Sequence, residues 1–164
     1  IDLMIGRFTD ESQRSQFHYE RLSDEPLQVV GGLHHPLRGA RELDMAELSH
    51  WPWILYPAST AVRKVSDDIF GRNGLALTSG VVETPSFLFA LEMMQTTDML
   101  SLQPTALVKR YIDKGLLARI PVDLPDRMPD YGMLTRLGET PTPATLAFMA
   151  VLRQMAGQPA PGIS

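Results

Sequence analysis

The sequence has 164 residues, of which 44% are hydrophobic, and its formal net charge is −4 at pH 7. It contains no cysteine, which excludes disulfide bonds, zinc–thiolate sites and thiol nucleophiles, and which fits a reducing compartment. The acidic balance argues against a nucleic-acid-binding surface on this segment, and every apolar run is interrupted well before the roughly 18 residues of a membrane span. This composition indicates one globular domain or two small lobes.

The first half of the chain predicts short strands and two helices. "IDLMIG" has the alternating pattern of a strand, and it begins without an initiator methionine or a signal peptide, as if cut from a longer protein. The segment "SDEP" at 23–26 predicts a turn between two extended stretches. The expected elements are strands at 1–6, 17–22, 27–30 and 53–57, a short helix at 43–51 and an amphipathic helix at 59–74.

The second half alternates strands and helices more clearly. Thr142 followed by Pro143 is a typical start of the final helix. The expected strands are 75–82, 99–104, 116–124 and 131–137, and the expected helices are 85–96, a segment from 105 to about 115, and 142–157. Strands separated by such helices predict an α/β fold with a largely parallel sheet, to which the pair of stretches within 17–30 adds an antiparallel element.

Two predicted strands are each followed by a helix, and hydroxyl residues lie in the turn between them, at Ser59-Thr60 and at Thr84-Pro85-Ser86. A helix start at the carboxyl edge of a sheet attracts anions, so these turns are candidate binding sites for a carboxylate or polar ligand. The alternative is that Ser59, Thr60 and Thr84 only cap their helices. At the second turn Pro85 removes one N–H donor and Glu83 adds negative charge, which favours a ligand with hydroxyl or amine groups over a dianion.

No other motif supports catalysis or cofactor binding. His34 and His35 are adjacent, so on a strand they point to opposite faces, and all four histidines are interpreted as solvated or hydrogen-bonded. "GRNG" lacks the lysine and hydroxyl residue of a phosphate loop, and there is no G-x-S-x-G or H-E-x-x-H sequence. We therefore expect no catalytic residue, no bound metal and no cofactor.

The order of the segments is more informative than any one of them. The series "DLMIGR", "EPLQVV" leading to "HHPL", "STAVRKVSDDIFGRNGL" and "VVETPSFLFALEMMQTTDMLSLQP" resembles the effector-binding domain of LysR-type transcriptional regulators over essentially all 164 residues. The resemblance implies two Rossmann-like α/β lobes joined by crossover strands, as in type 2 periplasmic binding proteins, with a small ligand in the cleft between the lobes. It assigns 1–38 and 133–157 to the first lobe, 50–125 to the second, 39–49 and 126–132 to the crossovers, and 158–164 to a flexible tail.

The same resemblance implies that a winged helix-turn-helix, a linker helix and the first lobe's opening strand-helix-strand precede Ile1. DNA would be bound only through that missing N-terminal domain, and the parent protein would be a cytoplasmic homodimer or homotetramer with no membrane contact. Arg7 is an attractive partner for an effector carboxylate, although it could equally pair with a surface acid. The positions that the resemblance implies for the effector are Gly6, Arg7, Ser59, Thr60, Glu83, Thr84, Pro85, Ser86 and Gln103.

The function that the resemblance implies is the sensing of a small organic acid or aromatic compound, without catalysis. Two alternatives share the two-lobed fold. The chain could be an exported solute-binding protein of a transport system, which an upstream signal peptide would favour. It could also be an enzyme, such as a dehydratase or transferase, which an acid–base pair with shifted pKa values in the cleft would favour.

Overall fold

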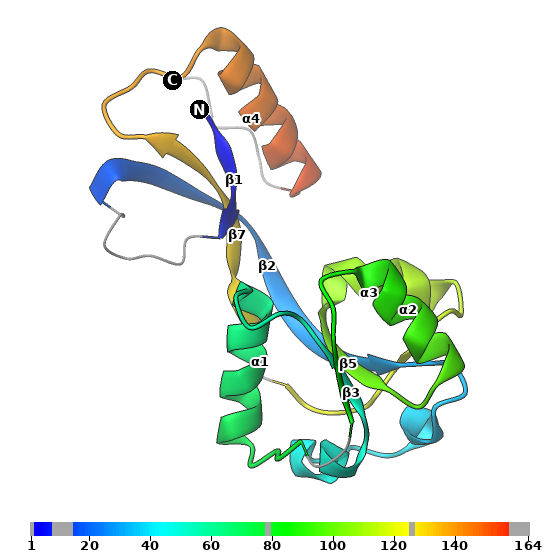
Figure 1. Ribbon diagram of the computed structural model, residues 1–164. Helices are drawn as coiled ribbons and strands as arrows, with labels where there is room; N and C mark the ends of the chain where they lie inside the picture. Colours follow the sequence, from blue (N-terminus) through cyan, green and yellow to red (C-terminus); the bar gives the residue numbers. More distant parts are fainter. Residues whose placement is uncertain (1, 8–14, 78–79, 125–126, 158–164) are drawn as a thin grey trace. The chain divides into compact units, whose positions relative to one another are not determined.

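The computed structural model describes residues 2–7, 15–77, 80–124 and 127–157 (Figure 1). Contacts divide the chain into a first unit, made of residues 1–25 and 129–164, and a second unit, made of residues 26–128. The chain passes between the units within two long strands, β2 (Phe17–Gly31) and β7 (Arg127–Arg136).

In the first unit, β1 (Met4–Arg7) runs antiparallel to β7, and β7 lies between β1 and β2 in the strand order. Helix α4 (Pro143–Met155) begins after Thr142, whose side chain accepts a hydrogen bond from the Thr145 N–H at 3.2 Å. Its Met149 is buried with Leu22 and Met133 in a small core, so one face of α4 packs on the strands.

Gly132 of β7 has no space for a side chain. A Cβ there would lie 2.2 Å from Tyr19 Cε2 and 2.6 Å from the Glu20 carbonyl oxygen. We expect Gly132→Ala to lower the free energy of unfolding by about 2–3 kcal/mol, because the crowded strand must shift. Gly6, its register partner on β1, has nothing within 4 Å of the same position, so Gly6→Ala is a matched control. Urea unfolding would measure both, and equal stabilities would contradict this account.

In the second unit, the short strand β3 (Trp53–Leu55) lies parallel between β4 (Val81–Glu83) and β5 (Leu100–Pro104). The second half of β2 runs antiparallel to β5 and to β6 (Ala118–Arg119). The helices of this unit are α1 (Ala61–Arg72), α2 (Phe87–Thr96) and α3 (Thr105–Asp113), with 3-10 helices at Pro36–Gly39 and Met45–His50.

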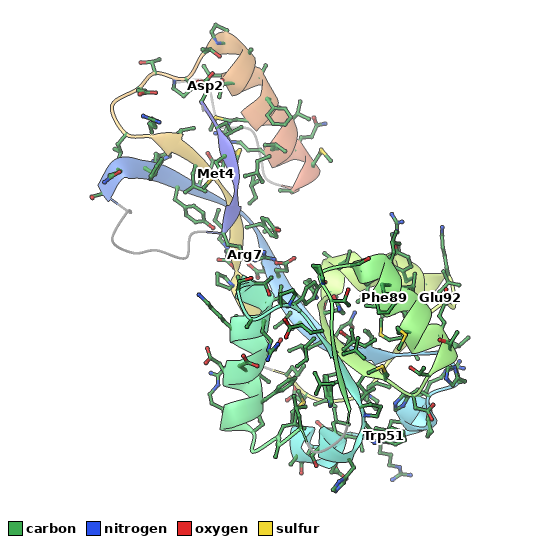
Figure 2. All side chains as sticks on the ribbon, viewed as in Figure 1. Asp2, Met4, Arg7, Trp51, Phe89 and Glu92 are labelled. Atoms are coloured by element: carbon green, nitrogen blue, oxygen red, sulfur yellow. The ribbon has the colours of Figure 1, made fainter. Side chains whose placement is uncertain are left out.

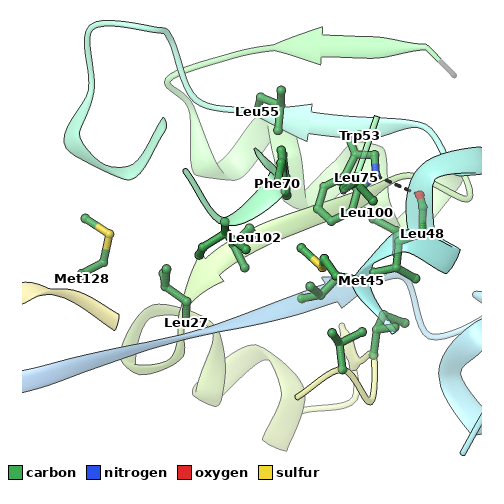
Figure 3. Close-up of a cluster of buried hydrophobic side chains, with 14 residues drawn as sticks. Leu27, Met45, Leu48, Trp53, Leu55, Phe70, Leu75, Leu100, Leu102 and Met128 are labelled. Atoms are coloured by element: carbon green, nitrogen blue, oxygen red, sulfur yellow. Dashed lines mark hydrogen bonds between the residues drawn. The ribbon is translucent and has the colours of Figure 1, made fainter. Parts of the chain in front are cut away.

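Both faces of this sheet are covered, since successive residues of β3 enter different cores. Trp53 and Leu55 pack with Ile69 and Phe70 of α1, and the Trp53 indole donates a hydrogen bond to the Leu48 carbonyl oxygen at 3.2 Å (Figure 3). Ile54, on the opposite face, joins a second core that includes Ala90 and Met94 of α2 and Val108 of α3. A parallel strand buried on both sides reads as a continuous apolar run, as "WIL" does here.

The predicted turn at 23–26 is wrong, and so is the antiparallel pair it would have created. β2 continues from Phe17 to Gly31 without a break. Pro26 is tolerated because the register with β5 begins only at Leu27, opposite Pro104, so no hydrogen bond to β5 is required from position 26. The sheet is also less parallel than predicted. Among the described residues, β3 pairs in parallel with β4 and β5, while β1·β7, β2·β5 and β2·β6 are antiparallel.

Other boundaries differ from the sequence prediction. The chain changes unit at Glu25–Pro26 and again at Met128–Pro129, and Met45–His50 forms a 3-10 helix in the second unit. The lobe and crossover bounds inferred from the resemblance stay a prediction. Among the described residues, the strand predicted at 75–82 is observed at Val81–Glu83 and the one predicted at 116–124 at Ala118–Arg119. Residues 78–79 and the tail at 158–164 lie outside the described residues.

Candidate functional site

The candidate turns of the second unit meet at the carboxyl edge of its parallel strands. Leu55, the last residue of β3, is the register partner of Glu83, the last residue of β4. Beyond the ladder, the Thr84 N–H donates a hydrogen bond to the Leu55 carbonyl oxygen at 3.0 Å. Helices α1 and α2 begin a few residues further on, at Ala61 and Phe87. The structure therefore brings together the two turns that the sequence singled out.

Hydrogen bonds assign a structural role to three of the hydroxyl groups. Thr60 caps α1: its hydroxyl accepts from the Arg63 N–H at 3.2 Å and donates to the Pro57 carbonyl oxygen at 2.8 Å. Ser86 caps α2 by accepting from the Phe89 N–H at 3.3 Å, and the Thr84 hydroxyl accepts from the Ser86 N–H at 3.1 Å. The prediction that Thr84 caps α2 is therefore wrong, because Thr84 closes the turn that precedes the cap.

Capping leaves some of this polarity unused. The hydroxyl hydrogens of Thr84 and Ser86 have no acceptor among the residues that the structure describes. Ser59, Pro85 and Ser86 are exposed, and Thr84 is partly exposed. The first N–H groups of any helix also lack intrahelical partners. This edge can therefore donate hydrogen bonds to an incoming carboxylate or carbonyl oxygen.

Gln103, at the end of β5, does not offer its amide to solvent. It is 1% exposed, its Nε2 donates to Ser101 Oγ at 2.8 Å, and Ser101 Oγ donates to the Ile54 carbonyl oxygen at 2.9 Å. A carbonyl oxygen can only accept, so the chain of hydrogen bonds has a fixed direction, and the Tyr56 hydroxyl donates to Gln103 Oε1 at 2.9 Å. Gln103 thus holds Tyr56 in place in this structure.

Tyr56 and Arg63 also lie at this edge, although no pattern in the sequence indicated them as site residues. Burial raises the pKa of the Tyr56 hydroxyl, and its hydrogen bond to Gln103 offsets this only in part, so the group stays protonated at neutral pH. Arg63 Nη1 donates to Glu83 Oε2 and to the Tyr56 carbonyl oxygen, each at 3.0 Å. Its Nε donates to Asp67 Oδ1 at 2.8 Å, and this hydrogen bond is the first cause of the raised pKa of Arg63. Arg63 is therefore shared between two carboxylates, and the three side chains together keep one negative charge.

Gly6 and Arg7 lie in the first unit, at the end of β1 (Figure 2). The Arg7 guanidinium forms an ion pair with Glu25, and Nη1 donates to the Tyr131 hydroxyl at 3.2 Å. Its Cζ lies 4.1 Å from the centre of the Tyr131 ring, a cation–π contact. The sequence left open whether Arg7 faces a ligand or an acid, and here it contacts an acid that is buried.

A family model described as the LysR substrate binding domain matches residues 1–157. The chain belongs to this family. The resemblance inferred from the sequence is thereby confirmed.

Curated relatives are named as regulators. The chain is 29% identical over 140 residues to the HTH-type transcriptional regulator YdcI of Escherichia coli, covering 85% of the chain and 45% of that protein. It is 27% identical over 155 residues to the HTH-type transcriptional regulator GalR of Pseudomonas putida, covering 94% of the chain and 39% of that protein. The chain therefore spans less than half the length of either relative.

Solved structures of the family share the fold. The regulatory domain of CcmR from Synechocystis, in complex with 2-PG, has a TM-score of 0.77 at 18% identity, with 94% of this chain and 73% of that chain covered. The effector-binding domain of BenM, with its effector benzoate, has a TM-score of 0.72 at 22% identity, with 98% and 73% covered. The α/β fold of LysR effector-binding domains, of the type 2 periplasmic-binding class, is thus confirmed.

Among the described residues no three His, Cys, Asp or Glu side chains are placed to hold an ion, and none of the described helices combines the length and apolarity of a membrane span. His35 is instead buried beside Trp51, with ring centres 4.5 Å apart, and its Nδ1 accepts a hydrogen bond from the Leu37 N–H at 3.1 Å. His35 is therefore hydrogen-bonded, which is one of the two states, solvated or hydrogen-bonded, that the sequence analysis assigned to the histidines.

Burial lowers the pKa of His35 from its usual value, and contacts with Asp98 oppose this only partly. The unfolded chain therefore takes up the proton first, as pH falls below about 6.5. The stability due to neutral His35 is complete above that pH and is lost as pH falls toward the folded pKa. We expect the free energy of unfolding to fall between about pH 7 and pH 5, and to fall less steeply in His35→Gln. Urea unfolding at each pH tests this, and identical slopes would contradict it.

Proposed function

We propose that this chain is the effector-sensing domain of a LysR-type transcriptional regulator and that it responds to a small organic acid or aromatic compound. The observation that carries the proposal is the polar edge of β3 and β4, where the Thr84 and Ser86 hydroxyls and two helix starts face outward on a chain of this family. Structural neighbours are described in complex with benzoate and with shikimate, both carboxylic acids.

The proposed effector contacts in the second unit are the exposed or partly exposed groups of the two turns. Thr84 and Ser86 would donate hydrogen bonds, while Ser59 and Thr60 form the facing turn at the start of α1. Glu83 would act mainly through Arg63, which it already pairs with, and Pro85 fixes the backbone between the two hydroxyl residues. Gln103 holds the Tyr56 hydroxyl in place, and within the first unit by itself Gly6 and Arg7 are proposed effector contacts.

The proposed mechanism is a shift of population, with no bond made or broken. An effector changes the balance between two forms of a protein only by the difference in its affinity for them. DNA would be bound by a separate helix-turn-helix domain, in a cytoplasmic homodimer or homotetramer. The names of the curated relatives support a regulator over a solute-binding protein or an enzyme.

A thermal-shift screen of the full-length protein tests this proposal. The panel contains aliphatic, hydroxylated and aromatic carboxylic acids, each beside its neutral amide. We expect at least one acid to raise the melting temperature, by an amount that grows with the logarithm of its concentration above the dissociation constant, while its amide does not. Thr84→Val is expected to raise the dissociation constant of that acid about tenfold, the effect of one lost hydrogen bond to a charged group. Thr140→Val, in the first unit, is the control. Amides that act as well as their acids, or a Thr84→Val response equal to wild type, would contradict the proposal.

A further inference from the structure

The Arg7 guanidinium is already occupied by groups of the protein. One terminal nitrogen, Nη2, is paired with Oε2 of Glu25, and the other, Nη1, donates to the Tyr131 hydroxyl. The Tyr131 ring covers one flat face of the group. The side chains of Arg7 and Glu25 are only 15% and 10% exposed, so this is a largely desolvated ion pair within the first unit.

The shape of a guanidinium makes this occupancy important. It binds a carboxylate best as a fork, with two parallel N–H groups on one edge of the plane. The edge between Nη1 and Nη2 is occupied by Tyr131 and Glu25. The remaining edge contains Nε, which has no hydrogen-bond partner among the described residues but is buried, so an external carboxylate does not reach it. An external carboxylate can therefore form the fork with Arg7 only if Glu25 leaves it.

We propose that Glu25 is a built-in counter-ion that holds the Arg7 carboxylate-binding position until an acidic effector takes its place. This deepens the proposed function and rests on it, because it states how an acid is recognised. The exchange conserves charge: one carboxylate replaces another on Arg7, so an acid can drive it and a neutral analogue cannot. Glu25 is a positioning residue, and it immediately precedes Pro26, where β2 enters the second unit.

Chemical rescue of the full-length Glu25→Ala variant tests this proposal. Removing the carboxylate leaves Arg7 unpaired beside a vacated space that acetate can fill. We measure the melting temperature in sodium acetate, in sodium chloride of equal ionic strength, and in acetamide. Acetate is expected to raise the melting temperature by about 4 °C at ten times its dissociation constant, and acetamide and chloride are not. The wild type is expected to show a much smaller acetate-specific rise at the same concentrations, since acetate must first displace Glu25.

The double variant Arg7→Gln/Glu25→Ala is the matched control, and in it the acetate effect is expected to vanish. An equal melting temperature of Glu25→Ala in acetate and chloride, or a rescue that survives in the double variant, would overturn the proposal. If Glu25→Ala does not fold in chloride, the same comparison is made with Glu25→Ser, which also removes the carboxylate and leaves the space that acetate fills. Because acetate is the probe, this result does not depend on whether any acid of the effector screen binds.

Discussion

Replacing Trp53 by alanine is expected to lower the free energy of unfolding by about 3–5 kcal/mol, the largest loss that we expect from a core residue of this chain. Trp53 belongs to β3, and its fully buried side chain packs against α1, where its ring meets Phe70 edge-on with ring centres 5.0 Å apart. Alanine would leave a cavity at the centre of the larger core and would also remove one of the two hydrogen bonds that the Leu48 carbonyl oxygen accepts, the other coming from the Trp51 N–H at 3.2 Å. Urea unfolding followed by circular dichroism measures the loss.

Trp51 provides the matched control for this experiment. It lies two residues earlier, is only partly buried, and packs against the edge of the core and against His35. Trp51→Ala should therefore cost clearly less than Trp53→Ala. Equal losses from the two substitutions would show that Trp53 does not organise this core.

The second large effect concerns the Arg7–Glu25 pair. Arg7→Gln is expected to lower the free energy of unfolding by about 3 kcal/mol, because it leaves the mostly buried Glu25 carboxylate without its counter-ion. Replacing both partners, in Arg7→Gln/Glu25→Gln, removes both charges and should recover most of that loss. Urea unfolding of the wild type, the two single variants and the double variant gives the coupling energy.

Arg153 and Glu20 offer a comparison within the same unit. This pair is bidentate, at 2.6 and 2.7 Å, and the Arg153 hydrogen bond lowers the pKa of Glu20. The stabilisation from this pair is therefore present above the unfolded pKa of Glu20 and is lost as pH falls through the lowered folded pKa.

If the effects of the Arg7 and Glu25 substitutions on the free energy of unfolding were simply additive, the two side chains would not act as a pair, and the proposed role of Glu25 would be wrong.

Sequence pattern located the regular elements of the second unit well. The strand expected at 99–104 is observed at Leu100–Pro104, and the helix expected at 85–96 at Phe87–Thr96, because apolar runs, caps and prolines all act locally. The same logic failed for β2. Pro26 is typical of a turn, and the sequence does not show that the strand's pairing with β5 begins just after it. Leu75 belongs to the core without being part of a strand, so an apolar run alone overextended the strand predicted at 75–82.

The site divides in the same way. The hydroxyl turns at Ser59-Thr60 and Thr84–Ser86 were predicted because a strand followed by a capped helix is a local pattern. The pairings of Tyr56 with Gln103 and of Arg63 with Glu83 join residues 47 and 20 positions apart, and no local signal indicates them. Glu25 was placed in a predicted turn, so its burial beside Arg7 could not be expected. The exposed hydroxyl groups of the site could thus be predicted from the sequence, whereas the hydrogen bonds that support them are seen only in the structure.

Hydrogen–deuterium exchange of the full-length protein, with and without the best acid from the thermal-shift screen, tests the central claim most directly. If the edge formed by the ends of β3 and β4 binds the effector, the backbone N–H groups of 56–62 and 83–89 should exchange more slowly when the acid is bound. Those of 109–113, on the exposed part of α3, should not change. An acid that binds saturably yet protects neither of the first two segments would contradict the account.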